Sequence, residues 1–269
     1  MIVTLDAGHY GSKYNQSPLV KNYYESVFNW KMANYMKEYF EKYNIQVRLT
    51  RESINHDIGL YDRGYMAKGS DIFISIHSNA CDSASVDYPV VIHGFDENST
   101  SSLALSLARL IGETIGTRQE GRTYTRKKTN SYDEYYGVLR GARAAKVKYR
   151  YIIEHSFHTN KAAAQFLLKE ENIRKLAFEE SELIAQYFGY KLFGDSIHKK
   201  KHIARIIVEN LNVRKVPDWS AKPCQVVHYG DAFTIDKEVS AKNGNTKMFK
   251  LKSGLYITTS KRYVETFYQ

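Results

Sequence analysis

Apolar residues in the first two-thirds of the chain alternate between two spacings. Short apolar or alternating runs predict strands at residues 2–5, 45–51, 71–77, 88–95 and 149–157. Apolar positions that recur on one face predict helices at residues 23–43, 60–68, 101–115 and 160–187. The run at 71–77 is almost continuously apolar and β-branched, as in a strand that is covered on both faces. The order of these elements predicts an α/β fold, a mostly parallel sheet with helices on both faces.

The rest of the chain has a different pattern. Residues 117–135 are polar and rich in Arg, Lys and Tyr, which predicts an excursion on the surface. After residue 202 come short strand-like runs separated by turn residues, typical of a small all-β barrel. We therefore expect an α/β domain over residues 1–190, a linker over 191–202 and a β-domain over 203–269.

Charge is concentrated in this last part. The chain has a net charge of +10, and residues 195–269 alone hold 14 Lys and Arg against 7 Asp and Glu. Such a surface favours an anionic polymer, and nucleic acid, an acidic membrane face and a wall that carries teichoic acid all fit on charge alone. We expect no nucleic-acid partner, because the tail has no recognisable recognition helix or stacking platform.

Several classes of protein are disfavoured by what the sequence lacks. The two cysteines, Cys81 and Cys224, form neither a disulfide framework nor a Cys-x-x-Cys zinc signature. No apolar stretch approaches the roughly 18–20 residues of a membrane helix, so no membrane insertion is expected. The N-terminus has no basic leader and only a short apolar run, which predicts synthesis in the cytoplasm without a signal peptide.

Four polar residues fall at one predicted edge of the sheet. His9 and His77 end two strands, Glu154 lies near the end of a third, and Glu25 lies in the first turn of the helix at 23–43. Ligands of open parallel sheets bind outside the carboxyl ends of the strands, so these groups should converge. Two histidines and a carboxylate are a catalytic zinc set, which predicts a Zn²⁺ site at His9, Glu25 and His77. Glu154 would then take and return the proton of an activated water.

Each of these residues also has a simpler interpretation. His9 and His77 could be structural or surface residues at strand ends. Asn22 and Glu25 have the spacing of a helix capping box, and Glu154 could be a buried carboxylate paired with an arginine. Among the neighbours, His155 should point to the opposite face of its strand, and Cys81 is more readily a small buried thiol than a nucleophile or a ligand.

The motifs around these residues resemble those of a known family. They are "LDAGHYG", Glu25, "VRLTR" with Leu60 and Arg63 downstream, "DIFISIHSNA" and "IIEHSFHTN", spread from residue 2 to about residue 188. This set is similar to the zinc-dependent N-acetylmuramoyl-L-alanine amidases of bacterial cell-wall turnover and phage lysis. The resemblance implies zinc ligands at His9, Glu25 and His77 and a catalytic Glu154. Tyr10 and Ser156 stand where the family usually has glycine, which predicts a reshaped groove.

The resemblance also implies a substrate and a setting. The expected reaction is hydrolysis of the amide between N-acetylmuramic acid and L-alanine in peptidoglycan, by a phage endolysin or a mother-cell enzyme that reaches the wall after release. Arg and Tyr residues of surface loops would hold the glycan and the peptide carboxylates. The tail resembles a bacterial SH3-like domain at "LNVRKVP", "YGDAFTI" and "LYITTSKRYVETF", which implies a wall-binding module with teichoic acid as one ligand.

Three alternatives stay open at this stage. The site could belong to a zinc peptidase that cuts within the stem peptide, or the chain could be a wall-binding protein without catalysis. The tail could also be a β-module that only stabilises or dimerises the protein.

Overall fold

The protein divides into two compact units. The computed structural model describes residues 1–191, 202–244 and 246–268, and the chain separates into Met1–Asp195 and Ser196–Gln269. Apart from its two end positions, the predicted linker at 191–202 lies outside the described residues. Of those end positions, His202 is already the first residue of a strand.

A six-stranded sheet forms the centre of the first unit. Its order is β2-β1-β3-β6-β4-β5, and β1 (Ile2–Ala7), β2 (Gln46–Leu49), β3 (Ile72–Asn79) and β6 (Tyr149–Phe157) are parallel. β4 (Val90–His93) runs antiparallel to β6, and β5 (Arg122–Tyr124) runs parallel to β4. The predicted mostly parallel sheet is thereby confirmed. The predicted strand at 88–95 and the edge strand β5 run opposite to the other four.

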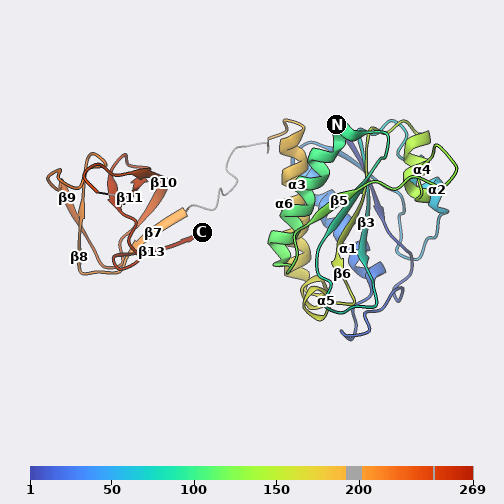
Figure 1. Ribbon diagram of the computed structural model, residues 1–269, viewed down its shortest axis with the longest axis horizontal. Coiled ribbons are helices and arrows are strands. Elements are labelled where there is room, and N and C mark those ends of the chain that lie inside the picture. The colour runs from blue at the N-terminus through green and yellow to red at the C-terminus, as the bar shows by residue number, and fades with distance from the viewer. Residues whose placement is uncertain (192–201, 245, 269) are drawn as a thin grey trace. The chain divides into compact units, whose positions relative to one another are not determined.

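Helices cover both faces of this sheet. α1 (Glu25–Lys42), α3 (Ser101–Ile115) and α6 (Glu170–Tyr187) pack on one face, over a core that includes Leu5, Ile74 and Ile153. α2 (Leu60–Tyr65) and α4 (Gly137–Ala144) pack on the other, over Phe73, Ile92 and Ile152. Figure 1 shows α3 and α6 on one side of the sheet and α2 and α4 on the other. Alternate residues of each central strand therefore belong to different cores.

The contact between α2 and α4 depends on glycine. A Cβ atom on Gly64 would lie 1.9 Å from the carbonyl oxygen of Val138, and one on Gly141 would lie 1.9 Å from that of Tyr61. No side chain fits at either position, so the two backbones pack directly against each other.

Three details of the predicted elements were wrong. The excursion at 117–135 contains the short strand β5, and the helix α4 that follows it was not predicted. The single helix predicted at 160–187 is two helices, α5 (Lys161–Leu168) and α6, because Lys169 between them has extended backbone with φ −81° and ψ 128°. Asn160 caps α5, since its side chain accepts a hydrogen bond from the backbone N–H of Ala163. A 3₁₀ turn at Asn98–Thr100 precedes α3.

The second unit is built of strands. One sheet has the order β12-β11-β10-β7-β13, and a separate pair joins β8 to β9. Their bounds are β7 His202–Ile206, β8 Asn210–Val213, β9 Gln225–His228, β10 Ala232–Ser240, β11 Lys247–Leu251, β12 Tyr256–Thr258 and β13 Val264–Tyr268. Its buried core includes Ile206, Val213, Leu251 and Ile257. The predicted β-rich tail is confirmed, whereas an SH3-like barrel stays a prediction.

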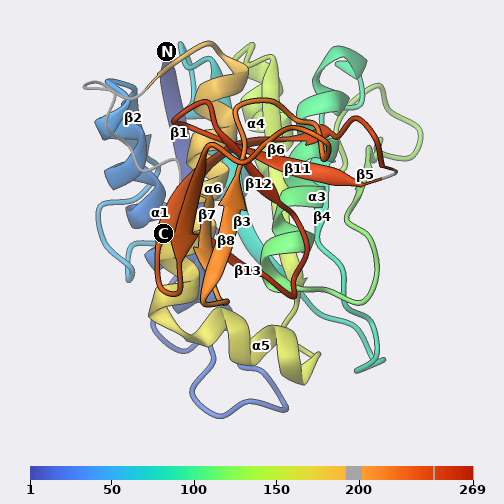
Figure 2. The same ribbon diagram turned by 90° about the vertical axis from the view of Figure 1, so that its left-hand side faces the viewer.

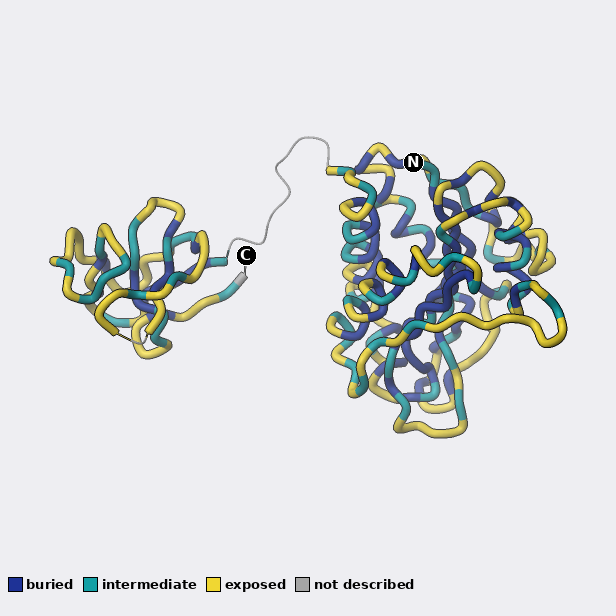
Figure 3. Tube along the Cα trace, turned by 45° about the horizontal axis from the view of Figure 1, so that its top comes forward, coloured by how far each residue is buried: buried dark blue, intermediate teal, exposed yellow. Residues whose placement is uncertain are grey.

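Exposure follows this architecture. Figure 3 shows buried segments in the central strands and exposed segments in the connecting loops of each unit. None of the helices among the described residues has the length and apolar content needed to cross a membrane.

Candidate active site

The four predicted site residues lie at one end of the sheet in the first unit. His9 follows β1, Glu25 is the first residue of α1, His77 lies on β3 and Glu154 lies on β6. Figures 1 and 2 both place the loop after β1 and helix α5 at this same end. His9 has a positive φ of 58°, a conformation uncommon for residues other than glycine.

Three of the four side chains form a compact group. The ligand atoms of His9, Glu25 and His77 all lie within 4.8 Å of one another. His9 Nε2 is 3.3 Å from one carboxylate oxygen of Glu25, and His77 Nδ1 is 3.0 Å from the other. Tetrahedral zinc with bonds of about 2.0–2.1 Å separates its ligand atoms by about 3.3 Å. The donor types and their spacing therefore fit a zinc ion.

The charges of this group also favour a cation. Burial acts to raise the pKa of Glu25, but hydrogen bonds with His77 and His9 hold that pKa well below its usual range. Burial acts to lower the pKa of His77, but the hydrogen bond with Glu25 and the nearby charge of Glu154 raise it to about 9. The buried Glu25 carboxylate thus stabilises positive charge beside it, and a bound cation would be stabilised in the same way.

Glu154 stands next to the group without being part of it. It is the direct register partner of His77 on the neighbouring strand, so the two side chains share one face of the sheet. Its Oε2 is buried and has no hydrogen-bond partner among the described residues. Burial and the charge of Glu25 raise the pKa of Glu154 to about 7, although the charge of His77 acts against this. A carboxyl group with that pKa can both accept and release a proton near neutral pH.

Gly8 makes room for His77. A Cβ atom at residue 8 would lie 2.2 to 2.6 Å from three atoms of the His77 ring. Asn29 fixes this backbone, because its amide donates a 3.0 Å hydrogen bond to the carbonyl oxygen of Gly8. Residue 8 must therefore be glycine, because the ring of His77 occupies the space that a side chain would need.

Two polar groups around Glu25 were missed from the sequence. The Asn15 amide nitrogen is 2.7 Å from Glu25 Oε2 and 3.1 Å from His9 Nε2. The backbone N–H of Ser78 donates a 3.1 Å hydrogen bond to Glu25 Oε1. The sequence offered no signal for them, because a lone Asn in a loop and a backbone amide carry no pattern.

Arg51 and Arg63, two arginines of the amidase-like sequence motifs, support the loop after β1. Arg51 is fully buried and donates to the carbonyl oxygens of Ala7, at 2.7 Å, and Ile54, at 2.9 Å. Arg63 donates a 2.7 Å hydrogen bond to the carbonyl oxygen of Ile58. Arg63 also donates to the carbonyl oxygen of Ala7, at 3.5 Å, and to the Asp57 carboxylate, at 3.0 Å. Because both arginines bind the carbonyl oxygen of Ala7, they position the start of the loop that carries His9.

Hydrogen bonds from Asp6 through Ser75 support the ring of His77. The Asp6 carboxylate is buried and accepts 2.7 Å hydrogen bonds from the hydroxyls of Thr50 and Ser75. Ser75 Oγ also lies 3.2 Å from His77 Nε2. These hydrogen bonds orient the His77 imidazole, as the groups around the ligands of a metal site do.

The simpler interpretations of Glu25 and Glu154 are wrong. α1 begins at Glu25 after Tyr24, which makes no side-chain capping bond, so Asn22 and Glu25 form no capping box. No arginine pairs with Glu154 among the ion pairs of the described residues.

The neighbouring candidates lie elsewhere. His155 points to the opposite face, as predicted, where its Nε2 is 2.9 Å from Glu180 Oε1 on α6. Cys81 is half-buried and not buried as predicted, and its thiol donates to the carbonyl oxygen of Ser83 and is not among the grouped ligand atoms. Ser156 is fully buried and its hydroxyl donates to Asp87 at 2.9 Å, so its side chain does not itself face a groove. Its φ of 81° explains why glycine suits this position.

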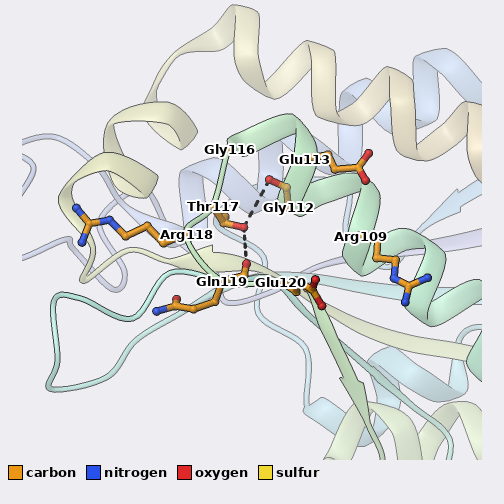
Figure 4. Close-up of a pocket in the computed structure, with 9 residues that line it drawn as sticks. Arg109, Gly112, Glu113, Gly116, Thr117, Arg118, Gln119 and Glu120 are labelled. Atoms are coloured by element: carbon orange, nitrogen blue, oxygen red, sulfur yellow. Dashed lines mark hydrogen bonds between the residues drawn. The ribbon is translucent and has the colours of Figure 1, made fainter. Parts of the chain in front are cut away.

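A cavity of about 550 Å³ lies at the end of α3, away from these residues (Figure 4). Thr117 in its wall donates to the carbonyl oxygen of Gln119 at 2.9 Å, and the lining includes Arg109, Glu113, Arg118 and Glu120. It contains none of the four site residues, so the chemistry of the donor set identifies the site better than cavity size does.

Comparison with known proteins shows the family of this chain. Residues 3–186 match the model of the Amidase_3 family, N-acetylmuramoyl-L-alanine amidase, and the chain belongs to this family. It is 30% identical over 280 aligned positions to the endolysin of Bacillus phage SPP1, with 98% of this chain and 97% of that protein covered. The enzyme is accordingly an N-acetylmuramoyl-L-alanine amidase, which acts on peptidoglycan.

Solved structures share the fold of the first unit. The catalytic domain of CwlV, an N-acetylmuramoyl-L-alanine amidase from Bacillus (Paenibacillus) polymyxa var. colistinus, superimposes with a TM-score of 0.58 at 20% identity, covering 71% of this chain and 99% of that one. An N-acetylmuramoyl-L-alanine amidase from Clostridium difficile 630 gives a TM-score of 0.58 at 24% identity, covering 70% and 96%.

Proposed function

We propose that the protein is a zinc-dependent endolysin that hydrolyses the amide between N-acetylmuramic acid and L-alanine, with His9, Glu25 and His77 as metal ligands and Glu154 as the catalytic residue. One observation carries this proposal. The ligand atoms of His9, Glu25 and His77 lie within 4.8 Å of one another, and Glu154 lies directly opposite His77 on the neighbouring strand. The endolysin similarity over 98% of the chain supports the phage setting.

The residues divide the work of the reaction. Zinc at this site would polarise the substrate carbonyl and lower the pKa of a water molecule to about 7. Glu154 removes the proton of the attacking water and then delivers it to the nitrogen of the leaving alanine. Asn15, Ser75 and the backbone N–H of Ser78 hold the ligand side chains in place through the hydrogen bonds described above.

We further propose that the second unit is an SH3-like wall-binding domain whose ligand is teichoic acid. The excess of 7 positive charges in residues 195–269 supports an anionic polymer as its partner. The enzyme would act on the wall after release from the cell in which it is made, as an endolysin does.

Mass spectrometry of the products from purified peptidoglycan tests the bond that is cut. The proposal predicts free peptides that begin with L-alanine, together with uncut glycan chains, from the wild type and not from Glu154→Ala. Glu41→Gln, an exposed carboxylate on α1, is the matched control and should cleave normally. Fragments cut within the stem peptide would show that the enzyme is a peptidase and not an amidase. Unchanged products from Glu154→Ala would show that Glu154 is not the catalytic residue.

A further inference from the structure

A group of arginines and tyrosines lies on the same face of the sheet as Glu154. The register places Glu154 opposite Val90, and Val90 opposite Arg122, across three neighbouring strands. Cross-strand partners point to the same face, and Val90 belongs to the core under α2 and α4. Arg122 and the next residue on this face, Tyr124, therefore extend the row of side chains that begins at His77 and Glu154.

Two exposed arginines in this group are held by aromatic rings. The Arg122 guanidinium carbon lies 4.2 Å from the centre of the Tyr88 ring, and that of Arg126 lies 3.6 Å from the centre of the Tyr135 ring. The backbone N–H of Tyr135 donates a 3.0 Å hydrogen bond to the carbonyl oxygen of Arg126, which sets these two residues opposite each other. Stacking of this kind orients a guanidinium group before any ligand arrives.

A pair of tyrosines joins the arginines to the site. The hydroxyls of Tyr124 and Tyr136 lie 3.2 Å apart, and Tyr136 immediately precedes α4. A side-chain hydrogen bond with Tyr136 raises the pKa of Arg126. Burial raises the pKa of Tyr124, and the hydrogen bond with Tyr136 and the charge of Glu154 raise it further. Tyr124 is the register partner of Ile92, which is opposite Ile152, so it lies on the same face of the sheet as Glu154.

Neither arginine has a carboxylate partner among the ion pairs of the described residues. Other arginines nearby do: Arg143 and Arg150 both pair with Asp96, and Arg150 also pairs with Glu134. A guanidinium group presents a planar fork of donors that matches a carboxylate in two places at once. Arg122 and Arg126 are therefore oriented and exposed, and no carboxylate in the described part of the chain neutralises their charges.

We propose that Arg122 and Arg126 bind a carboxylate of the stem peptide and so make the enzyme prefer peptides that carry it. Two strand spacings separate Arg122 from Glu154, about 10 Å at 4.7–4.9 Å each. An extended peptide covers about 3.3–3.6 Å per residue, so this distance corresponds to a carboxylate within the first three residues after the scissile amide. The inference rests on the proposed function, because it takes Glu154 as the point of cleavage.

The first test compares two soluble substrates, an N-acetylmuramoyl tripeptide with free carboxylates and the same compound with its carboxylates amidated. The wild type should cleave the free form with a kcat/KM about 10-fold to 100-fold higher, the range of charged hydrogen bonds. In Arg122→Gln/Arg126→Gln this preference should vanish, mainly through a higher KM. Lys128→Gln, an exposed charge on the same excursion, should keep the preference. Equal cleavage of both substrates by the wild type, or an unchanged preference in the double variant, would overturn the proposal.

Calorimetry separates this inference from the proposed reaction. The full chain is titrated with a free tripeptide that begins with L-alanine, in its carboxylate and amidated forms, so that no cleavage is needed. Tighter binding of the carboxylate form, lost in the double variant and retained in Lys128→Gln, supports the arginine site even if another bond proves to be cut. Equal binding of both forms overturns it while leaving the amidase reaction untouched.

Discussion

At the scale of single residues, Gly8 gives a sharp test of the ligand geometry. Gly8→Ala would force the His77 ring to move, because the added Cβ would lie 2.2 Å from it. We expect zinc affinity to fall about 10- to 100-fold, as for other changes that disturb the orientation of a ligand. Competition with a fluorescent zinc chelator measures this affinity.

The control for this prediction is Gly69→Ala. Gly69 has a φ of 80° and open space around its Cα, so alanine adds backbone strain without touching the site. It should lower the free energy of unfolding by about 1–2 kcal/mol and leave zinc affinity unchanged. Wild-type affinity in Gly8→Ala would show that His77 is not held as described.

Glu154 sets the expected pH dependence. With a pKa raised to about 7, its carboxylate form is depleted as the pH falls through that value. Because the proposed base acts as the carboxylate, kcat/KM should decline below about pH 7 and approach a tenfold loss per pH unit. The profile is measured with zinc content determined at each pH, so that metal loss is counted separately. A flat profile from pH 8 to pH 5 with zinc retained would contradict the role of Glu154.

At the scale of elements, the contact of α2 with α4 predicts that alanine in place of a helical glycine destabilises the protein, whereas helix propensity alone predicts that it stabilises the protein. Alanine in place of a glycine inside a helix normally stabilises it, by up to about 1 kcal/mol. Gly141→Ala should instead lower the free energy of unfolding by about 1–3 kcal/mol, because its Cβ would meet the Tyr61 carbonyl oxygen at 1.9 Å. Urea denaturation measures the change.

Gly112→Ala on α3 is the comparison for this helix contact. There the nearest atom would be Thr117 Oγ1 at 3.2 Å, on a side chain that can move. Its effect should be small. Equal effects of the two substitutions would argue against direct packing of the α2 and α4 backbones.

The regularity of the apolar pattern in each element decided whether the sequence could predict it. α3 was predicted with its correct ends, because its apolar residues follow one face without interruption. α4 was missed because two glycines and two arginines among its eight residues weaken the helical pattern. Lys169, which separates α5 from α6, carries no glycine or proline signal, and only its backbone conformation reveals the break.

The convergence of the candidate residues was predictable for a related reason. His9 follows one apolar strand, and His77 and Glu154 lie toward the ends of two others that meet at the same edge, so topology alone brings them together. The role of Gly8 and the contacts of Asn15 depend on packing between segments distant in the sequence. The same holds for the stacked arginines, because their alignment with Glu154 requires the antiparallel strand β4, which the sequence did not predict as antiparallel.

At the scale of the whole molecule, charge predicts how the chain binds a cell wall. If teichoic acid is the ligand of the basic second unit, cosedimentation of the full chain with walls should weaken steeply as salt is raised, because salt screens such contacts. Walls chemically stripped of teichoic acid should bind much less protein at low salt. Equal binding to native and stripped walls would assign the second unit another ligand.

Zinc content, measured for the wild type, Glu154→Gln and His77→Ala, tests the proposed metal centre. We expect about one zinc per chain in the wild type and in Glu154→Gln, and a strongly reduced content in His77→Ala, with amidase activity lost in both variants. Zinc retained by His77→Ala, or full activity in zinc-free protein, would contradict a metal centre at His9, Glu25 and His77.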